Sequence, residues 1–141
     1  MAANSVTERF VHKISIHPDD IDQFNHVNNV VYVRWVQETA VGHWNAAATE
    51  AQKESIGWVV VRHEIDYVSS ARLGDEVVAR TWVGTAEKNI FERHTELFRA
   101  ADMRTLARAR SLWCPINLQT FKPIRVGADV YERFSIPGNQ P

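Results

Sequence analysis

The sequence lacks the features that mark secreted, membrane and nucleic-acid-binding proteins. It has one cysteine, Cys114, in 141 residues, so no internal disulfide can form. No apolar run approaches the roughly 20 residues of a membrane helix, and no basic flank with an apolar stretch opens the chain. Sixteen basic and seventeen acidic residues leave a net charge of -1, which removes the electrostatic reason to expect nucleic acid or an anionic membrane as a partner. We therefore expect a cytoplasmic protein with neither partner.

What the chain does contain is enough apolar material for a core. Apolar residues make up 45% of the sequence and aromatic residues 10%, in a length common for one domain. We expect residues 1–141 to form a single domain. Residues 9–16 place apolar Phe10, Ile14 and Ile16 on roughly one face and predict a first strand. Residues 28–52 contain no proline and place apolar side chains at spacings of three and four, which predicts one long helix covered over most of its circumference.

The period changes after Gly57 to that of strands. Val59, Val61, Ile65 and Tyr67 alternate with polar residues, as in a half-buried strand. Three further strands are predicted over residues 76–86, 90–98 and 104–116. The connections between the predicted strands are short, which favours antiparallel neighbours and a four-stranded meander.

The last predicted strand carries small residues on its inward face, with Thr105, Ala107, Ala109 and Ser111 at alternate positions. Small side chains let a helix rich in tryptophan and tyrosine approach the sheet closely. The expected fold class is therefore α+β, an antiparallel sheet that wraps around one long central helix.

A dense polar cluster, "DDIDQFNHVNN", covers residues 19–29 just before the helix. Its residue types could bind a metal, but their spacing fits no strong metal motif, and a calcium loop counted from Asp20 lacks the required residues at Phe24, Asn25 and Val31. A second interpretation is a helix cap, in which Asn28 or Asn29 bonds the free amides of the first turn.

The third interpretation is catalytic. Amides at a helix N-terminus carry positive potential and can stabilise an oxyanion that forms on an attacked carbonyl. Asp22 could then attack that carbonyl or activate water. The residues alone leave the cap and the catalytic site equally supported.

The segment "DIDQFNHVNNVVYVRWVQE", residues 20–38, resembles the Asp-x-Asp-x-x-x-His-Val-Asn-Asn-x-x-Tyr motif of hotdog-fold acyl thioesterases, the 4-hydroxybenzoyl-coenzyme A thioesterase-like family. "VVVRHEIDYVSSARLGDEV", residues 59–77, resembles a second segment of that family. The resemblance implies a five-stranded sheet around the helix. It also implies protomers joined edge to edge, with active sites at their interface, as a homodimer or a dimer of dimers.

The resemblance also implies roles for individual residues. Asp22 matches the catalytic carboxylate, and the amide near Asn29 matches the group that polarises the thioester carbonyl. His26 matches a histidine that orients substrate or water, although it could simply hold the loop. Glu38 matches a frequent acidic position, but it lies four residues after Arg34 and could pair with it instead. Phe24 stands where plant acyl carrier protein thioesterases have asparagine, which argues against transferring their scheme.

Two more residues are candidates for binding substrate. Trp58 could line an acyl pocket or be an ordinary core tryptophan. Asn89, which opens a predicted strand, could border the site by analogy of position. The phosphates of coenzyme A would need basic residues, and the sequence does not choose among Arg62, Arg72, Lys88 and Arg125.

The function expected from the resemblance is hydrolysis of an acyl-coenzyme A thioester, with no metal and no cofactor. The main alternative is a non-catalytic acyl-coenzyme A binding or sensing module of the same fold. A dehydratase of this fold and a purely structural dimer are less favoured.

Overall fold

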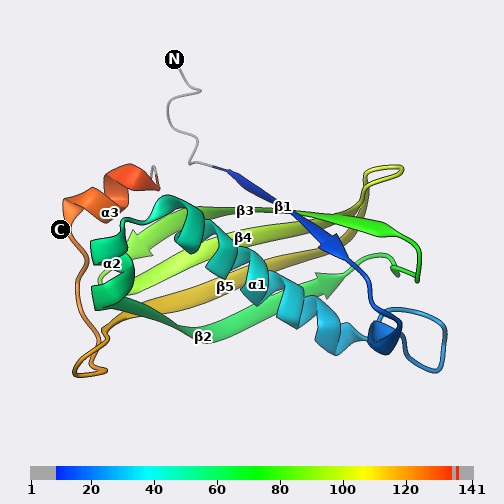
Figure 1. The fold of residues 1–141 in the computed structure, drawn as a ribbon, viewed down its shortest axis with the longest axis horizontal. Coiled ribbons are helices and arrows are strands. Elements are labelled where there is room, and N and C mark those ends of the chain that lie inside the picture. Colours follow the sequence, from blue (N-terminus) through cyan, green and yellow to red (C-terminus); the bar gives the residue numbers. More distant parts are fainter. Residues whose placement is uncertain (1–8, 135, 137–141) are drawn as a thin grey trace, which may run out of the picture.

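The computed structural model describes residues 9–134 and 136. It contains a five-stranded antiparallel sheet with strand order β1-β3-β4-β5-β2 and one long helix, α1 (Asn29–Ala47). Figure 1 shows α1 running across one face of the curved sheet. The expected α+β arrangement, an antiparallel sheet around a central helix, is confirmed. The strands are β1 (Phe10–Ser15), β2 (Ile56–Tyr67), β3 (Glu76–Glu87), β4 (Ile90–Arg99) and β5 (Arg104–Asn117).

The helical region divides in two. α1 ends at Ala47, and a second helix, α2 (Glu50–Ser55), follows. Thr49 caps α2: its hydroxyl accepts from the Gln52 amide at 3.1 Å, and the Gln52 side chain accepts from the Thr49 amide at 2.9 Å. This reciprocal capping box starts a new helix. The prediction of a single helix over residues 28–52 is therefore wrong beyond Ala47.

Strand β2 forms over the predicted residues but takes an unexpected position in the sheet. It pairs with β5 at the outer edge of the sheet instead of with β3, so the four-stranded meander is wrong. The pairing register shifts between Val60 and Arg62, and a shift of one residue exchanges the faces of a strand. Val59 and Val61 are consequently 44% and 56% exposed and do not share a buried face with Ile65.

The main core lies between α1 and the sheet. Tyr32, Trp35 and Val36 of α1 are almost fully buried and belong to one cluster with Ala107 and Ala109 of β5. The predicted floor of small residues is confirmed at Ala107, Ala109 and Ser111, which are all buried, whereas Thr105 is only partly buried. Large helix side chains and small sheet side chains thus complement each other in volume, as dense packing requires.

A second cluster closes one end of the sheet. The short helix α3 (Ala128–Arg133), which the sequence did not predict, buries Val130 and Tyr131 there together with Phe134. Six residues are too few to establish a helical period in a sequence. In Figure 1, α2 and α3 lie at one end of α1, and the 3-10 turn η2 (Pro18–Asp20) lies at the other.

We find no helix in the described part of the chain that is both long and apolar enough to cross a membrane.

Candidate functional site

The first turn of α1 has one amide that remains available. The side chain of Asn28 accepts a hydrogen bond from the Val30 amide at 3.1 Å, and its carbonyl accepts from the Val31 amide at 2.9 Å. Within residues 9–134 and 136, nothing accepts a hydrogen bond from the amide of Asn29, and the residue is exposed. Asn28 is therefore the cap, and Asn29 supplies an unshared donor at the positive end of the helix dipole.

The loop of residues 22–26 folds over the carboxylate of Asp22. Its Oδ1 accepts from the amides of Phe24, at 2.9 Å, and His26, at 3.2 Å. Asn25 takes a positive φ of 64°, which asparagine tolerates better than most residues. No described residue donates to Oδ2 of Asp22. The loop fixes one carboxylate oxygen and leaves the other for a ligand.

A short antiparallel bridge between Ile21 and Val27 closes the base of this loop. The Asp22 amide donates to the His26 carbonyl at 2.8 Å, and the Asn28 amide donates to the Asp20 carbonyl at 2.8 Å. The closed loop contains Asp22 and His26 and leads into Asn29, the first residue of α1. The three residues predicted from the sequence therefore lie at the same end of the helix.

Asp20 is the buried acid of the cluster, and sequence reasoning missed its role. It is 4% exposed, accepts from the His17 amide at 3.0 Å, and pairs with Arg34 of α1 at 3.0 Å. Burial alone raises the pKa of Asp20, but hydrogen bonds from the His17 amide and Arg34 outweigh it and hold this pKa below its usual value. Asp20 therefore remains ionised at neutral pH and fixes α1 to η2.

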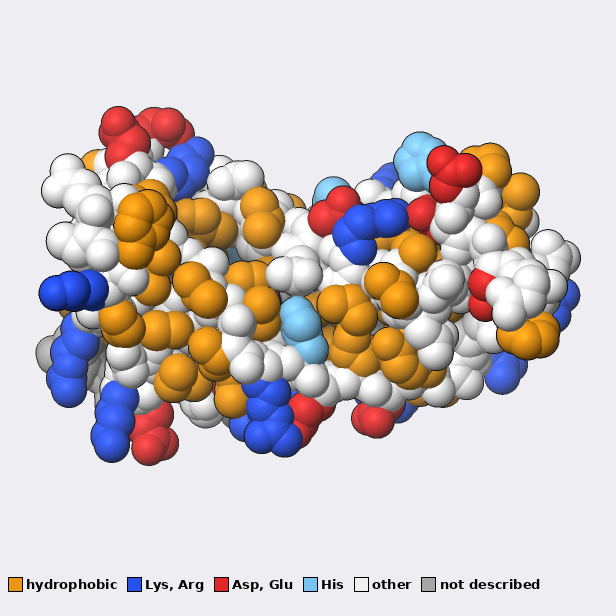
Figure 2. All heavy atoms as spheres, turned by 90° about the horizontal axis from the view of Figure 1, so that it is seen from below, with side chains coloured by type: hydrophobic (Ala, Val, Ile, Leu, Met, Phe, Trp, Pro, Cys, Tyr) orange, Lys and Arg blue, Asp and Glu red, His pale blue; other side chains and the backbone are white. Residues whose placement is uncertain are grey.

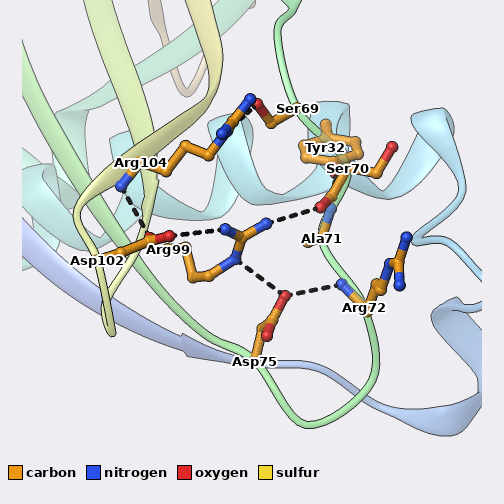
Figure 3. A network of polar contacts seen from close by, with 9 residues as sticks. All are labelled: Tyr32, Ser69, Ser70, Ala71, Arg72, Asp75, Arg99, Asp102 and Arg104. Carbon is orange, nitrogen blue, oxygen red and sulfur yellow. Dashed lines mark hydrogen bonds and ion pairs between the residues drawn. The ribbon is translucent and has the colours of Figure 1, made fainter.

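Ala71, in the connection between β2 and β3, braces the site from the other side. Its carbonyl accepts from the Val27 amide at 2.9 Å, and its amide donates to the Tyr32 hydroxyl at 2.9 Å. Arg99 supports this connection by donating to the Ser70 carbonyl at 3.2 Å and to Asp75 at 3.3 Å (Figure 3). The same guanidinium reaches across to bind Asp102 at 2.9 Å, so it ties the connection to the β4–β5 turn.

Glu38 is not part of this cluster. It follows Asn29 by nine residues, which is about 13 Å along a helix axis. Its carboxylate is half exposed and lies 3.8 Å from Arg34, whose shorter contact is with Asp20. The pair between Arg34 and Glu38 that the sequence allowed is thus present, and within one chain Glu38 stands apart from Asp22.

Trp58 and Asn89 lie toward the opposite end of α1. Asn89 occupies the turn between β3 and β4, two residues before Phe91. Trp58 packs edge-on against Phe91 and Trp44, with ring centroids 5.0 and 5.5 Å apart. One chain does not bring these residues to Asp22.

Trp58 lines a cavity of about 170 Å³ between α1, the sheet and α3. Most of its wall is apolar, but Arg93 of β4 also lines it and is only 8% exposed. Sequence reasoning overlooked Arg93. The signal was present, because Arg93 alternates with Phe91, Thr95 and Leu97 on the inward face of its strand, where a charged residue is rare.

No group of three or more His, Cys, Asp or Glu side chains within residues 9–134 and 136 is arranged to hold a metal ion.

Comparisons with known proteins agree with this architecture. A family model described as the thioesterase-like superfamily matches residues 16–134. Solved structures with the same fold include a 1,4-dihydroxy-2-naphthoyl-CoA thioesterase from Synechocystis, with a TM-score of 0.78 and 17% identity over 91% of this chain and 96% of that one. No curated protein sequence matches this chain.

Two further structures bear on ligands. A thioesterase from Thermus thermophilus, solved with coenzyme A and zinc, has a TM-score of 0.76 and 18% identity over 88% of this chain and 90% of that one. The 12:0-ACP thioesterase from Umbellularia californica has a TM-score of 0.75 and 18% identity over 94% of this chain and 52% of that one. At these identities the structures establish the fold.

The first prediction concerns the brace at Ala71. Tyr32→Phe leaves the buried Ala71 amide without an acceptor, so we expect the free energy of unfolding to fall by about 1–3 kcal/mol. Tyr67→Phe is the matched control, because its half-exposed hydroxyl makes only a 3.3 Å contact with the Asn29 carbonyl. Urea denaturation measures both. Equal losses in the two variants would contradict the assigned role of Tyr32.

The second prediction concerns pH. Because the pKa of Asp20 is lower in the folded state, its stabilising contribution is present above the unfolded value of about 4 and disappears as pH falls through the folded value. We expect Asp20→Asn to lose about 1 kcal/mol at pH 7, with the difference from wild type shrinking below about pH 4. Denaturation between pH 3 and 7 tests this, with the exposed Asp19→Asn as control. A gap that stays constant with pH would argue against it.

Proposed function

This chain belongs to the thioesterase-like superfamily, and we propose that it hydrolyses an acyl-coenzyme A thioester to a free acid and coenzyme A. The family supports a thioester hydrolase as the class of enzyme. The observation that carries the site assignment is the unshared amide of Asn29 at the start of α1, preceded in the same closed polar segment by a carboxylate, Asp22, with one uncommitted oxygen.

The proposed role of the Asn29 amide is to polarise the thioester carbonyl. It lies at the N-terminus of a 19-residue helix, where the amides and the helix dipole favour negative charge. When the carbonyl carbon is attacked, its oxygen gains negative charge, and a fixed donor stabilises that charge without reorganisation. Loss of one such donor in a protease costs about 10²- to 10³-fold in rate, so this group alone is a substantial contribution.

Asp22 supplies the attack in one of two ways. Its Oδ2 can add to the carbonyl carbon, expel the coenzyme A thiolate and form an acyl anhydride that water then hydrolyses. Alternatively, Oδ2 takes a proton from a water molecule, whose oxygen adds to the same carbon. The two loop amides on Oδ1 fix the orientation of the carboxylate in both routes.

Other candidate residues take supporting roles in this proposal. His26, whose amide already bonds Asp22, orients substrate or water with its imidazole. Glu38 is a secondary candidate, because in one chain it is engaged with Arg34. Arg72 directly follows the Ala71 brace, and no described acid pairs with its guanidinium, so we favour it among the basic candidates for contact with the phosphates of coenzyme A.

The proposed active unit is a homodimer joined through β2. This strand is twelve residues long and lies at the edge of the sheet, where its outer backbone groups are unpaired. Figure 2, seen from below Figure 1 and thus from the side of β2, shows hydrophobic side chains across the middle of the face with charged groups mostly toward its rim. Exposed apolar residues of β2 and α1 include Val30, Val41, Val59, Val61 and Tyr67.

A non-catalytic acyl-coenzyme A binding module is the alternative. One observation favours it: Oδ1 of Asp22 has a structural task in closing its loop, which would retain aspartate without chemistry. Such a module binds acyl-coenzyme A saturably and releases no thiol.

The third prediction separates these functions. Asp22→Asn keeps a carbonyl oxygen for the Phe24 and His26 amides, so the loop should persist while hydrolysis falls by about 10²- to 10⁴-fold. Thiol release from a panel of acyl-coenzyme A esters measures the rate, calorimetry measures retained binding, and Asp19→Asn is the control. Near-normal turnover in Asp22→Asn would remove Asp22 from the mechanism, and no turnover in wild type would favour the binding module. Single-turnover hydrolysis in heavy-oxygen water identifies the covalent route, because only that route places a protein oxygen in the product.

The fourth prediction concerns the dimer. Val61→Lys places a charge on the edge strand β2 and should convert the dimer to a monomer with loss of activity. Val11→Lys is a matched control, because Val11 is equally exposed, 58% against 56%, but lies on β1 at the opposite edge. Sedimentation velocity gives the oligomeric state. A wild-type monomer, or a Val61→Lys dimer, would count against this interface.

A further inference from the structure

The cavity at the far end of α1 has an unusual wall for an apolar pocket. Aliphatic and aromatic residues form most of it, yet it includes Arg93, whose side chain is buried. A cavity of about 170 Å³ holds roughly six or seven non-hydrogen atoms, judged by comparison with a 150 Å³ cavity that binds benzene. The aromatic part of the wall consists of Trp44, Trp58, Phe91, Trp113 and Phe134.

Two of the three guanidinium nitrogens of Arg93 make no hydrogen bond to a described residue. Its Nη1 contacts His43 Nδ1 at 3.0 Å and Thr81 Oγ1 at 3.2 Å. Its Nε and Nη2 bond no described residue, and no described carboxylate lies within ion-pair distance of the guanidinium. Nε and one Nη are the atoms that a guanidinium presents to a carboxylate as a planar fork.

Electrostatics favours an anion in this position. Burial lowers the pKa of Arg93 to about 10, so it is still charged at neutral pH, although its charge has been removed from water. The guanidinium of Arg93 is already desolvated in the folded protein. When a ligand carboxylate binds to it, only the carboxylate loses hydration, and the electrostatic attraction between the two charges opposes that loss.

The cavity and the reaction centre belong to different ends of α1. Ala40 and Trp44, which line the cavity, follow Asn29 by 11 and 15 residues, about 17 to 22 Å along the helix. A five-carbon acyl chain cannot span that distance. Antiparallel pairing of two β2 strands about a two-fold axis near mid-strand, however, places Trp58 of one copy near residues 65–67 of the other. The Tyr67 hydroxyl contacts the Asn29 carbonyl, so the cavity of one copy approaches the helix start of the other.

We propose that this cavity receives the far end of the acyl group and that Arg93 selects short acyl groups ending in a carboxylate. The inference rests on the proposed acyl-coenzyme A hydrolysis and names its substrate class, ω-carboxyacyl thioesters of about five carbons. Arg93 is then a specificity-determining residue. Trp58 and Trp113 line the same cavity, and their buried indole Nε1 atoms have no acceptor among the described residues.

The fifth prediction compares two esters of equal chain length, glutaryl-coenzyme A with a terminal carboxylate and pentanoyl-coenzyme A without one. We expect wild type to prefer the glutaryl ester by tenfold or more in kcat/KM, because hydrogen bonds between a guanidinium and a carboxylate are about twice as strong as those between neutral groups. Arg93→Gln should abolish or reverse the preference. Arg80→Gln, on the neighbouring strand but paired with Glu96 at 2.7 Å and partly exposed, should leave it unchanged.

The ratio within each protein cancels differences in the folded fraction. Should Arg93→Gln fail to fold, calorimetric binding of the two esters to Asp22→Asn, with Arg93 intact, gives the same comparison without turnover. Hydrolysis of both esters with no preference for the glutaryl ester overturns the role of Arg93 and leaves the hydrolase standing. Tighter binding of the glutaryl ester without hydrolysis of any ester in wild type supports the cavity and overturns the hydrolase.

Discussion

The candidate site depends on one main-chain hydrogen bond, from the Val27 amide to the Ala71 carbonyl. It joins the polar loop to the connection between β2 and β3. Val27 and Ala71 are both buried, so water cannot replace the bond, and an unpaired group there would bear its full desolvation cost. The Tyr32 hydroxyl, in the first turn of α1, accepts a hydrogen bond from the amide of Ala71. Loop, connection and helix therefore share one fixed point, and Asp22 and Asn29 are positioned relative to it.

The sequence predicted the features that depend on residues close to one another in the chain. The long apolar period of α1, the small inward residues of β5 and the grouping of Asp22, His26 and Asn29 all follow from residue spacing. The failures have physical reasons too. Thr49 and Gln52 formed a capping box inside a continuous helical period, and local capping prevailed over periodicity. The register shift at Val60 exchanged the faces of β2, which no alternation pattern reveals. The pairing of β2 with β5 depends on the route of the connection around α1, which is a tertiary property.

The two edges of the sheet are unequal, and this difference links assembly to the site. β1 has six residues, whereas β2 has twelve and carries the exposed Val59 and Val61. Native proteins usually shorten, charge or cover a long edge strand, because its free backbone groups pair readily with other chains. Such an edge is stable in solution if a second copy covers it. One end of β2 borders the cavity at Trp58, and the other contacts the start of α1 through Tyr67. Coverage of β2 by a second copy would therefore bring together the two halves that one chain keeps apart.

Arg93 shows why a buried charge needs a reason beyond stability. A well-packed apolar side chain of similar volume often stabilises a core as well as or better than a buried ion. The contacts of Arg93 with His43 and Thr81 satisfy one nitrogen, and they link α1, β3 and β4. A neutral side chain such as glutamine could make comparable hydrogen bonds at lower desolvation cost. The guanidinium adds two things that glutamine does not: a permanent charge and a planar pair of further donors directed from a rigid strand. Both properties matter for a ligand that is itself planar and anionic, so the residue type is better explained by recognition than by packing.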